Sequence, residues 1–589
     1  MKPYWADEKV YELYDKFIET CILNNNSLLT HEENIFTINA LDDNIKRFIN
    51  NYLEGSEGFY EKVYKQFEGA SYESLLVFTH ANWLWNMASS DFTKEYKMDV
   101  PRKLFEKQLN KPIWEDVFPE GGIGKAGPFL KYNKPTEIAF IILLFRQLKE
   151  FVHKGEVITK DQANSMVEKI CLKCRYNQDG DSDFLLQEIW ENIPEKKLAM
   201  YNILLHLCNP SKYEPIASES HKNQIYDAFS PLLDDASIKV KNANRDEQIL
   251  YIRGKITDIL KKEDFTFYDG DFKEISNFNL GEKNFDELQA LQYKKSIILY
   301  GPPGTSKTYF AESLAKTLIS RHYFKDSERL KDYFKMKPDI TKDRIHRFQL
   351  HPNYNYEGFI AGIQLKNGVT QPIRGEFLEL IEKVRVDDCP HVIILDEINR
   401  IDLSRLFGEL FSALENRNKP IKLSIGEFII KVPENLFFIG TMNEIDFSLE
   451  RIDFALRRRF VWFFYGFNAE ILRSMIEEKQ KLLGTNIKDF EINHFIENVK
   501  KLNKQIEGME ELGKQYEIGH TFFAEIVDIY KSYKEFEGWT NLKLFRKDGP
   551  VQVLWDISIK PILVAFLGNM DKITQDEKVK IIEDIFFTK

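Results

Sequence analysis

The sequence predicts a multidomain protein with an α-helical N-terminal domain, an α/β core built on a parallel sheet, and a small α-helical C-terminal part. Apolar residues recur three and four positions apart over much of residues 1–270, which is the spacing of amphipathic helices. Between 285 and 465, short apolar runs alternate with helical segments, as in parallel strands joined by crossover helices. From 466 to 589 the strand-like runs cease and amphipathic helices return.

The composition is that of a globular protein. The 589 residues are 43% hydrophobic and 29% charged, and this length predicts more than one domain. No apolar run approaches the roughly 18–20 residues of a membrane helix, and the charged start MKPYWADEKVYELYDKF lacks the apolar core of a signal peptide. We therefore expect a soluble cytoplasmic protein with no membrane partner.

The net charge of −11 bears on DNA binding. A protein that binds DNA regardless of sequence gains affinity by neutralising phosphates with basic side chains. An acidic chain gives no such support, although a local basic groove stays possible.

Five cysteines are too few for a disulfide framework, but four residues raise the question of a metal. Cys171 and Cys174 form a CxxC pair, and His206 and Cys208 follow further along the chain. Together they could hold zinc. Alternatively, the CxxC pair lies one turn apart on a helix and packs in the core, which the unusual spacing of the second pair favours.

Helical spacing in the first half is clearest in a few segments. They are VYELYDKFIETCIL, NIKRFINNYL, EIAFIILLFRQLKEFV, KLAMYNILLHL and EQILYIRGKITDILKK. The periodicity breaks after the last of these, which places the domain boundary near 270–285. The first half has no P-D…D/E-x-K or His-Asn-His set, so the sequence predicts no nuclease there.

The stretch LYGPPGTSKTYF nearly matches the phosphate-binding loop G-x-x-x-x-G-K-S/T. Ser306 replaces the second glycine. The apolar run SIILY precedes the loop and the helical TYFAESLAKTLIS follows, and this context directs backbone N–H groups and a helix N-terminus at phosphates. The residues expected to bind a nucleotide are Gly301, Pro302, Pro303, Gly304, Thr305, Ser306, Lys307 and Thr308.

Chemical roles follow from a second motif, HVIILDEINR, in which a strand-like run ends in Asp396 and Glu397. We expect this strand beside the loop, with Asp396 holding Mg²⁺ through water and Glu397 polarising the attacking water as general base. Lys307 would reach the β- and γ-phosphates, and the Thr308 hydroxyl would bind Mg²⁺.

A third strand, NLFFIGTMN, ends in Asn443, whose amide would orient the water or contact the γ-phosphate. RIDFALRRRF then places Arg457, Arg458 and Arg459 before a further strand, FVWFFY. These arginines could form a solvated basic patch. After the preceding motifs we favour an arginine finger, from Arg458 and Arg459, that reaches a neighbouring subunit's phosphate.

In this order and spacing the motifs resemble those of the AAA+ ATPase superfamily, whose MoxR-like and related branch often carries alanine or serine where Ser306 stands. Several stretches resemble, more specifically, the McrB family, whose members are the motor subunits of modification-dependent restriction systems. They are FQLHPNYNYEGFIAGI, DEINRIDLSRLFGELFSALE, TMNEIDFSLERIDFALRRRF and EIGHTFFAEI. Two hairpin-like inserts agree with this branch, IQLKNGVTQPIRG (363–375) and IKLSIGEFIIKV (421–432).

The chain departs from the McrB pattern at three positions. Where the family has MNTAD, Asn443 and Asp446 match but Glu444 and Ile445 do not, and Glu517 stands where arginine often precedes the IGH block. McrB proteins use GTP. With these departures the sequence leaves the nucleotide open between ATP and GTP.

The resemblance implies an AAA+ core with a helical lid (466–589) and Mg²⁺-dependent nucleotide hydrolysis. It also implies a ring, expected to be a hexamer, and a separate McrC-like nuclease subunit in restriction or anti-phage defence. The N-terminal domain would bind DNA, a partner or an invader's product. Two alternatives stay open: a MoxR-like protein-remodelling ATPase, and a nucleotide-gated scaffold or sensor.

Overall fold

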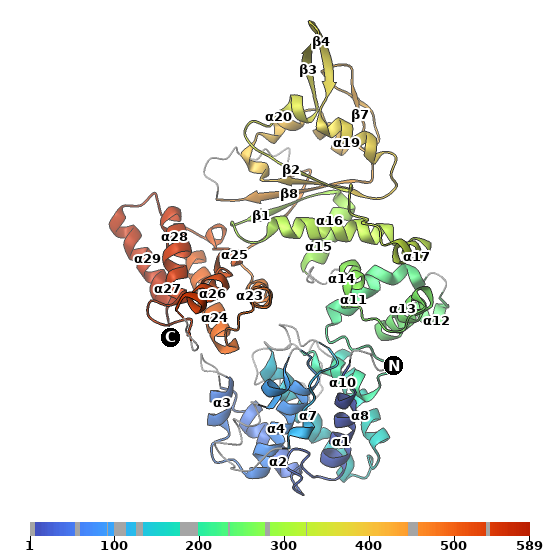
Figure 1. Ribbon diagram of the computed structural model, residues 1–589, viewed down its shortest axis with the longest axis vertical. Helices are drawn as coiled ribbons and strands as arrows, with labels where there is room; N and C mark the ends of the chain where they lie inside the picture. Colours follow the sequence, from blue (N-terminus) through green and yellow to red (C-terminus); the bar gives the residue numbers. More distant parts are fainter. Residues whose placement is uncertain are drawn as a thin grey trace. The chain divides into compact units, whose positions relative to one another are not determined.

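The computed structural model describes residues 6–53, 59–90, 92–98, 114–124, 133–176, 198–233, 236–276, 283–325, 327–445, 457–537 and 542–588. The chain divides into two compact units, Met1–Ser276 and Asn277–Lys589. Within these described ranges, helices form the regular structure of the first unit, and the strands all belong to the second (Figure 1). The multidomain prediction is confirmed.

The first unit is helical, as the sequence predicts. Its main helices are α1 (Glu8–Phe17), α2 (Ile38–Asn44), α3 (Phe59–Gln66), α4 (Tyr72–Met87), α7 (Lys134–His153), α8 (Lys160–Tyr176), α10 (Met200–Cys208), α11 (Glu219–Phe229), α12 (Ile238–Lys241), α13 (Arg245–Leu260) and α14 (Gly270–Ser276). Helix α4 and the first half of α7 are buried nearly all round, because their sequences are apolar on every face. They form the centre of the core of this unit.

The candidate zinc ligands lie on α8 and α10, where Cys171 and Cys174 are buried. Both ring nitrogens of His206 are engaged: Nε2 lies 2.6 Å from the Tyr11 hydroxyl and Nδ1 lies 2.6 Å from the Tyr213 carbonyl oxygen. Within the described ranges, the four side chains do not gather closely enough to share an ion. The structure therefore favours packing over zinc.

A buried carboxylate joins α7 to α10. Glu137 is fully buried and accepts hydrogen bonds from the backbone N–H groups of Ala199 (2.8 Å) and Met200 (2.9 Å), two of the otherwise unpaired donors at the start of α10. Burial raises the pKa of Glu137 to about 8, against the opposing effect of these two hydrogen bonds. The protonation state of Glu137 therefore affects the stability of the N-terminal end of α10.

The pKa of Glu137 in the folded unit exceeds its unfolded value, so between these two pKa values the folded state binds more protons than the unfolded state. The stability of the folded state therefore falls as the pH rises through that interval. We predict that protection of the α10 amides from hydrogen exchange, corrected for intrinsic rate, falls between pH 6 and pH 8. In Glu137→Gln, protection should be lower overall but nearly constant over that interval. Glu156→Gln, at an exposed position, is the control, and an unchanged pH dependence in Glu137→Gln would contradict the assignment.

The second unit contains a five-stranded parallel sheet in the order β2-β5-β8-β1-β9. Its strands are β1 (Ser296–Gly301), β2 (Ile345–Gln349), β5 (His391–Asp396), β8 (Leu436–Asn443) and β9 (Val461–Phe464). Alternate residues of β1 face opposite layers: Ile297 and Leu299 pack in one hydrophobic cluster and Ile298 in the other. Burial on both faces explains the continuous apolar runs that the sequence shows.

Helices cover both faces of the sheet (Figure 1). The helices α15 (Lys283–Lys294) and α16 (Lys307–Tyr323) contribute to one cluster. On the other face lie α18 (Tyr356–Phe359), α19 (Glu376–Val384), α20 (Leu403–Phe407) and α21 (Leu410–Glu415). A further helix, α17 (Ser327–Met336), follows α16.

The sheet order places β8 between β1 and β5, and β8 pairs with both. The carboxyl end of β5 still lies beside the loop, as predicted, because the Thr308 hydroxyl donates a hydrogen bond to Asp396. Strand order depends on long-range pairing, which the local pattern does not contain. All three strands are parallel, so their carboxyl ends still meet at one edge.

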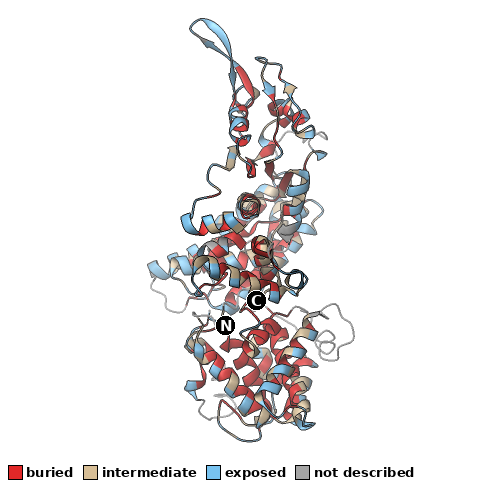
Figure 2. Ribbon diagram, turned by 90° about the vertical axis from the view of Figure 1, so that its right-hand side faces the viewer, coloured by how far each residue is buried: buried red, intermediate tan, exposed pale blue. Residues whose placement is uncertain are grey.

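Both predicted hairpins are present. The strands β3 (Ala361–Lys366) and β4 (Val369–Arg374) join at Asn367 and Gly368, whose φ angles of 54° and 78° suit a two-residue hairpin turn. This hairpin extends from the unit, and its outer end is exposed (Figures 1 and 2). The second is shorter and pairs β6 (Ile421–Lys422) with β7 (Ile429–Ile430).

The C-terminal segment is helical and has its own core, centred on the buried Trp555. Its helices are α23 (Ala469–Leu483), α24 (Asp489–Glu507), α25 (His520–Phe523), α26 (Ile526–Glu537), α27 (Pro550–Leu554), α28 (Lys560–Phe566) and α29 (Lys572–Phe586). We call this segment the lid. Among the described residues of the chain, no helix is long and apolar enough to span a bilayer.

Candidate nucleotide site

The loop between β1 and α16 has left-handed backbone at Gly304 (φ 75°) and Ser306 (φ 60°). For residues other than glycine this conformation costs roughly 1–2 kcal/mol, because Cβ crowds the following carbonyl oxygen. Phosphate-binding loops usually carry glycine at the position of Ser306. Glycine avoids this backbone strain there and also leaves room for the phosphates. In this chain Ser306 adopts the left-handed conformation despite its cost.

Lys307 begins α16 and is buried against the loop. Its Nζ donates hydrogen bonds to the carbonyl oxygens of Gly301 (3.1 Å) and Pro302 (2.6 Å) and to the Thr305 hydroxyl (3.3 Å). The ammonium group is thus held over the concave side of the loop, where a phosphate would bind. The remaining expected loop residue, Pro303, completes the turn before Gly304.

Two hydroxyl groups converge on one carboxylate oxygen. Thr308 Oγ1 donates to Asp396 Oδ1 at 3.0 Å, and Thr441 Oγ1 donates to the same oxygen. The backbone N–H of Glu397 in turn donates to Thr441 Oγ1 at 3.4 Å. Hydroxyl and carboxylate oxygens are hard ligands of the kind that Mg²⁺ takes alongside water and phosphate, so Thr308 and Asp396 fit the ion expected there.

Glu397 follows Asp396 in a left-handed conformation (φ 57°) and starts the turn Ile398–Arg400. One of its carboxylate oxygens lies 2.9 Å from Arg400 Nη2. The side chain is mostly buried, with 23% exposed, so the ion pair restrains a carboxylate that water can still reach.

Asn443 ends β8 directly opposite Gly301, at the start of the loop. The buried Asn399 donates from Nδ2 to the Asn443 carbonyl oxygen at 2.6 Å, which ties the Glu397 turn to this strand end. Burial raises the pKa of the next residue, Glu444, against the opposing charges of Arg457 and Lys307. Asp446, which matches the McrB pattern, lies outside the described residues.

Sequence reasoning missed Thr441 and Asn399. Thr441 is a hydroxyl residue inside the otherwise apolar run LFFIGTM, and that irregularity was the available signal. Asn399 belongs to DEINR, but no local pattern shows that its amide reaches another strand.

The two arginines differ in exposure. The Arg458 side chain is 66% exposed and that of Arg459 is 9% exposed, although Nη2 of each lies close to Glu415 Oε1 (3.1 and 3.2 Å). Arg459 also donates from Nε to the Phe411 carbonyl oxygen (3.3 Å), and its guanidinium lies over the ring of that residue. Arg459 is thus fixed within its own subunit, whereas Arg458 projects into solvent.

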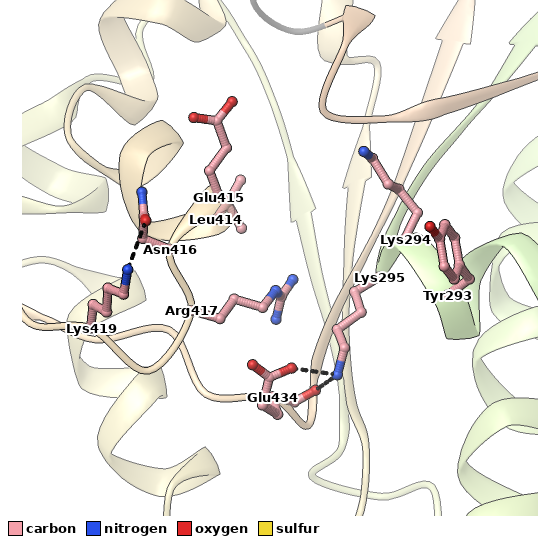
Figure 3. A pocket seen from close by; sticks show the side chains of 9 residues that line it. All are labelled: Tyr293, Lys294, Lys295, Leu414, Glu415, Asn416, Arg417, Lys419 and Glu434. Atoms are coloured by element: carbon pink, nitrogen blue, oxygen red, sulfur yellow. Dashed lines mark hydrogen bonds and ion pairs between the residues drawn. The ribbon is translucent and has the colours of Figure 1, made fainter.

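Both arginines precede β9 and so lie at the amino edge of the sheet, away from the loop at the carboxyl edge. The six-residue strands β1 and β5 separate the two edges by roughly 20 Å. A shallow cavity of about 340 Å³ lies at the amino edge. Figure 3 shows the side chains that line it. Its lining includes Glu415 and the basic side chains of Lys294, Lys295, Arg417 and Lys419.

Comparisons with known proteins agree with this geometry. The model of the AAA domain (dynein-related subfamily) matches residues 296–460. The chain is 29% identical over 314 residues to the "Type IV methyl-directed restriction enzyme EcoKMcrB subunit" of Escherichia coli (strain K12), covering 51% of this chain and 61% of that protein. The chain fits the McrB-like family of AAA+ proteins, with its AAA domain at residues 296–460.

Two further relatives match part of the chain. The "Type II restriction enzyme BsuMI component YdiS" of Bacillus subtilis (strain 168) is 26% identical, over 35% of this chain and 68% of that protein. The "26S proteasome regulatory subunit 8 homolog" of Naegleria fowleri is 22% identical, over 43% of this chain and 56% of that one.

We predict that Thr441→Val weakens Mg²⁺-dependent nucleotide binding about tenfold, because Asp396 loses one of the two donors that orient its carboxylate. Thr441→Ser, which keeps the hydroxyl, should bind nearly as the natural protein does. The measurement is a Mg²⁺ titration with a fluorescent nucleotide. Thr317→Val, which removes a buried hydroxyl bonded within α16, is the control, and equal Mg²⁺ dependence in both valine variants would refute this role.

Proposed function

We propose that the chain is a Mg²⁺-dependent nucleoside triphosphatase. The observation that carries this proposal is the convergence of Thr308 and Thr441 on Asp396, beside a loop that holds Lys307. When bound, Mg²⁺ would neutralise charge that develops on the β- and γ-phosphates. Lys307 would exchange its loop carbonyls for phosphate oxygens, which satisfy the same donors.

The remaining groups act on water. Glu397, restrained by Arg400, would accept a proton from the attacking water as general base. Asn443, opposite Gly301, would orient that water or contact the γ-phosphate. The exposed Arg458 would complete the site of a neighbouring subunit as its arginine finger, and Arg459 would support it through Glu415.

This arrangement requires an oligomer, because one subunit carries the loop and the arginine on opposite edges of its sheet. We propose a ring, expected to be a hexamer. The division of the chain into an N-terminal domain (1–270), an AAA+ core (285–465) and a helical lid (466–589) is part of the same proposal.

We further propose that the ring is the motor subunit of an McrBC-like restriction or anti-phage defence system. The likeness to the two restriction components supports this role. GTP or ATP would drive DNA translocation, a separate McrC-like nuclease subunit, or both. The helical first unit, outside the matched AAA domain, would recognise DNA or another target. Stimulation of turnover by DNA or by the nuclease would separate this role from protein remodelling.

We predict that Glu397→Gln binds nucleotide with nearly normal affinity but turns over at least about a hundredfold more slowly, since it removes only the base. Lys307→Ala should abolish detectable binding. Fluorescent ATP and GTP analogues measure binding, and phosphate release measures turnover. Undiminished turnover in Glu397→Gln would disprove the assignment of the base.

A mixing experiment tests the arginine. We predict that Arg458→Ala alone binds nucleotide but loses about a thousandfold in turnover. Mixed with Glu397→Gln, it should regain activity, because some interfaces then combine an intact glutamate with an intact arginine. Two inactive variants that stay inactive when mixed would contradict action in trans, provided that they assemble together. Arg405→Ala, whose side chain is 89% exposed, is the matched surface control.

A further inference from the structure

A short lid segment, Gly519–Thr521, lies directly against the phosphate loop. The backbone N–H and the hydroxyl of Thr521 both donate to the carbonyl oxygen of Gly304, at 3.1 and 3.0 Å. A side-chain carbon on Gly519 would lie 2.2 Å from the carbonyl carbon of Gly304, so only glycine fits there. We call these three residues the clasp.

The middle residue of the clasp contacts the unusual residue of the loop. His520 Nε2 lies 2.9 Å from Ser306 Oγ, and the His520 side chain is completely buried. Burial and the nearby Lys307 charge lower the pKa of His520 to about 4, so the imidazole is neutral. Glycine at position 306 would offer no side-chain partner, which makes this hydrogen bond particular to the serine.

Glu517, two residues before the clasp, reaches the connection between core and lid. A carboxylate oxygen of Glu517 accepts a hydrogen bond from the backbone N–H of Phe467 at 2.7 Å and packs against Gly466. Rotation of the lid about this connection would therefore move the clasp and strain its bonds to the loop. One stretch of five residues, 517–521, thus contacts both the core–lid connection and the phosphate loop.

We propose that His520 is a positioning residue for nucleotide binding, matched to Ser306. Serine resists the left-handed turn at this position, and its hydrogen bond to His520 offsets that resistance. The clasp thereby holds the loop in its phosphate-binding shape and transmits the position of the lid to it. This inference rests on the proposed nucleoside triphosphatase function.

A double-mutant cycle tests the pairing. His520→Ala should weaken the binding of fluorescent ATP or GTP, with Mg²⁺, about tenfold in the natural background. In the Ser306→Gly background the same change should weaken it less than about threefold, because glycine needs no partner to hold the turn. His494→Ala, at a partly buried lid histidine against Phe545, is the control and should have equal effects in both backgrounds.

Ser306→Ala gives an independent arm, because it leaves the lid unaltered. It keeps the strained Cβ and removes the hydroxyl, so it should bind nucleotide more weakly than Ser306→Gly. Equal losses from His520→Ala in both backgrounds would overturn the pairing and leave the proposed function standing, provided that binding still depends on Lys307. No nucleotide binding by the natural protein would overturn both.

Discussion

The proposed nucleotide site depends on one carboxylate oxygen of Asp396, which accepts hydrogen bonds from two threonine hydroxyls. Thr308 belongs to the helix after the loop, Thr441 to β8, and Asp396 to β5, so the shared oxygen joins three neighbouring segments of the fold. Each donor also restricts the carboxylate to one orientation, which a metal site needs before the ion arrives. The parallel sheet makes this convergence possible, because its strands end at a common edge.

In the proposed function, that edge supplies only half of the hydrolysis site. The loop, Asp396, Glu397 and Asn443 lie at the carboxyl ends of the strands, whereas Arg458 precedes β9 at the other edge. An exposed arginine beside a buried one suits an arginine finger. The buried side chain fixes the position of the segment, and the exposed side chain can reach a nucleotide on a neighbouring subunit. Under the proposed function, hydrolysis therefore depends on assembly.

Local features were predictable from the sequence. Apolar runs predict the strands, Asn367-Gly368 predicts the hairpin, and the strand–loop–helix context predicts the loop. Features that depend on contacts between distant residues were not. The insertion of β8 between β1 and β5, the reach of Asn399 to Asn443, and the hydrogen bond between His520 and Ser306 all join segments that no local pattern relates. The different burial of Arg458 and Arg459 likewise depends on Glu415 and Phe411.

The most direct test of the account is phosphate release by the natural protein, with ATP and with GTP, as a function of protein concentration in the presence of Mg²⁺. A site shared between subunits predicts that turnover per subunit rises with concentration until the ring is filled. Turnover with one nucleotide in preference to the other would show whether the AAA domain uses ATP or GTP. Hydrolysis that is independent of concentration down to the monomer, or none with either nucleotide, would contradict a hydrolysis site shared between subunits.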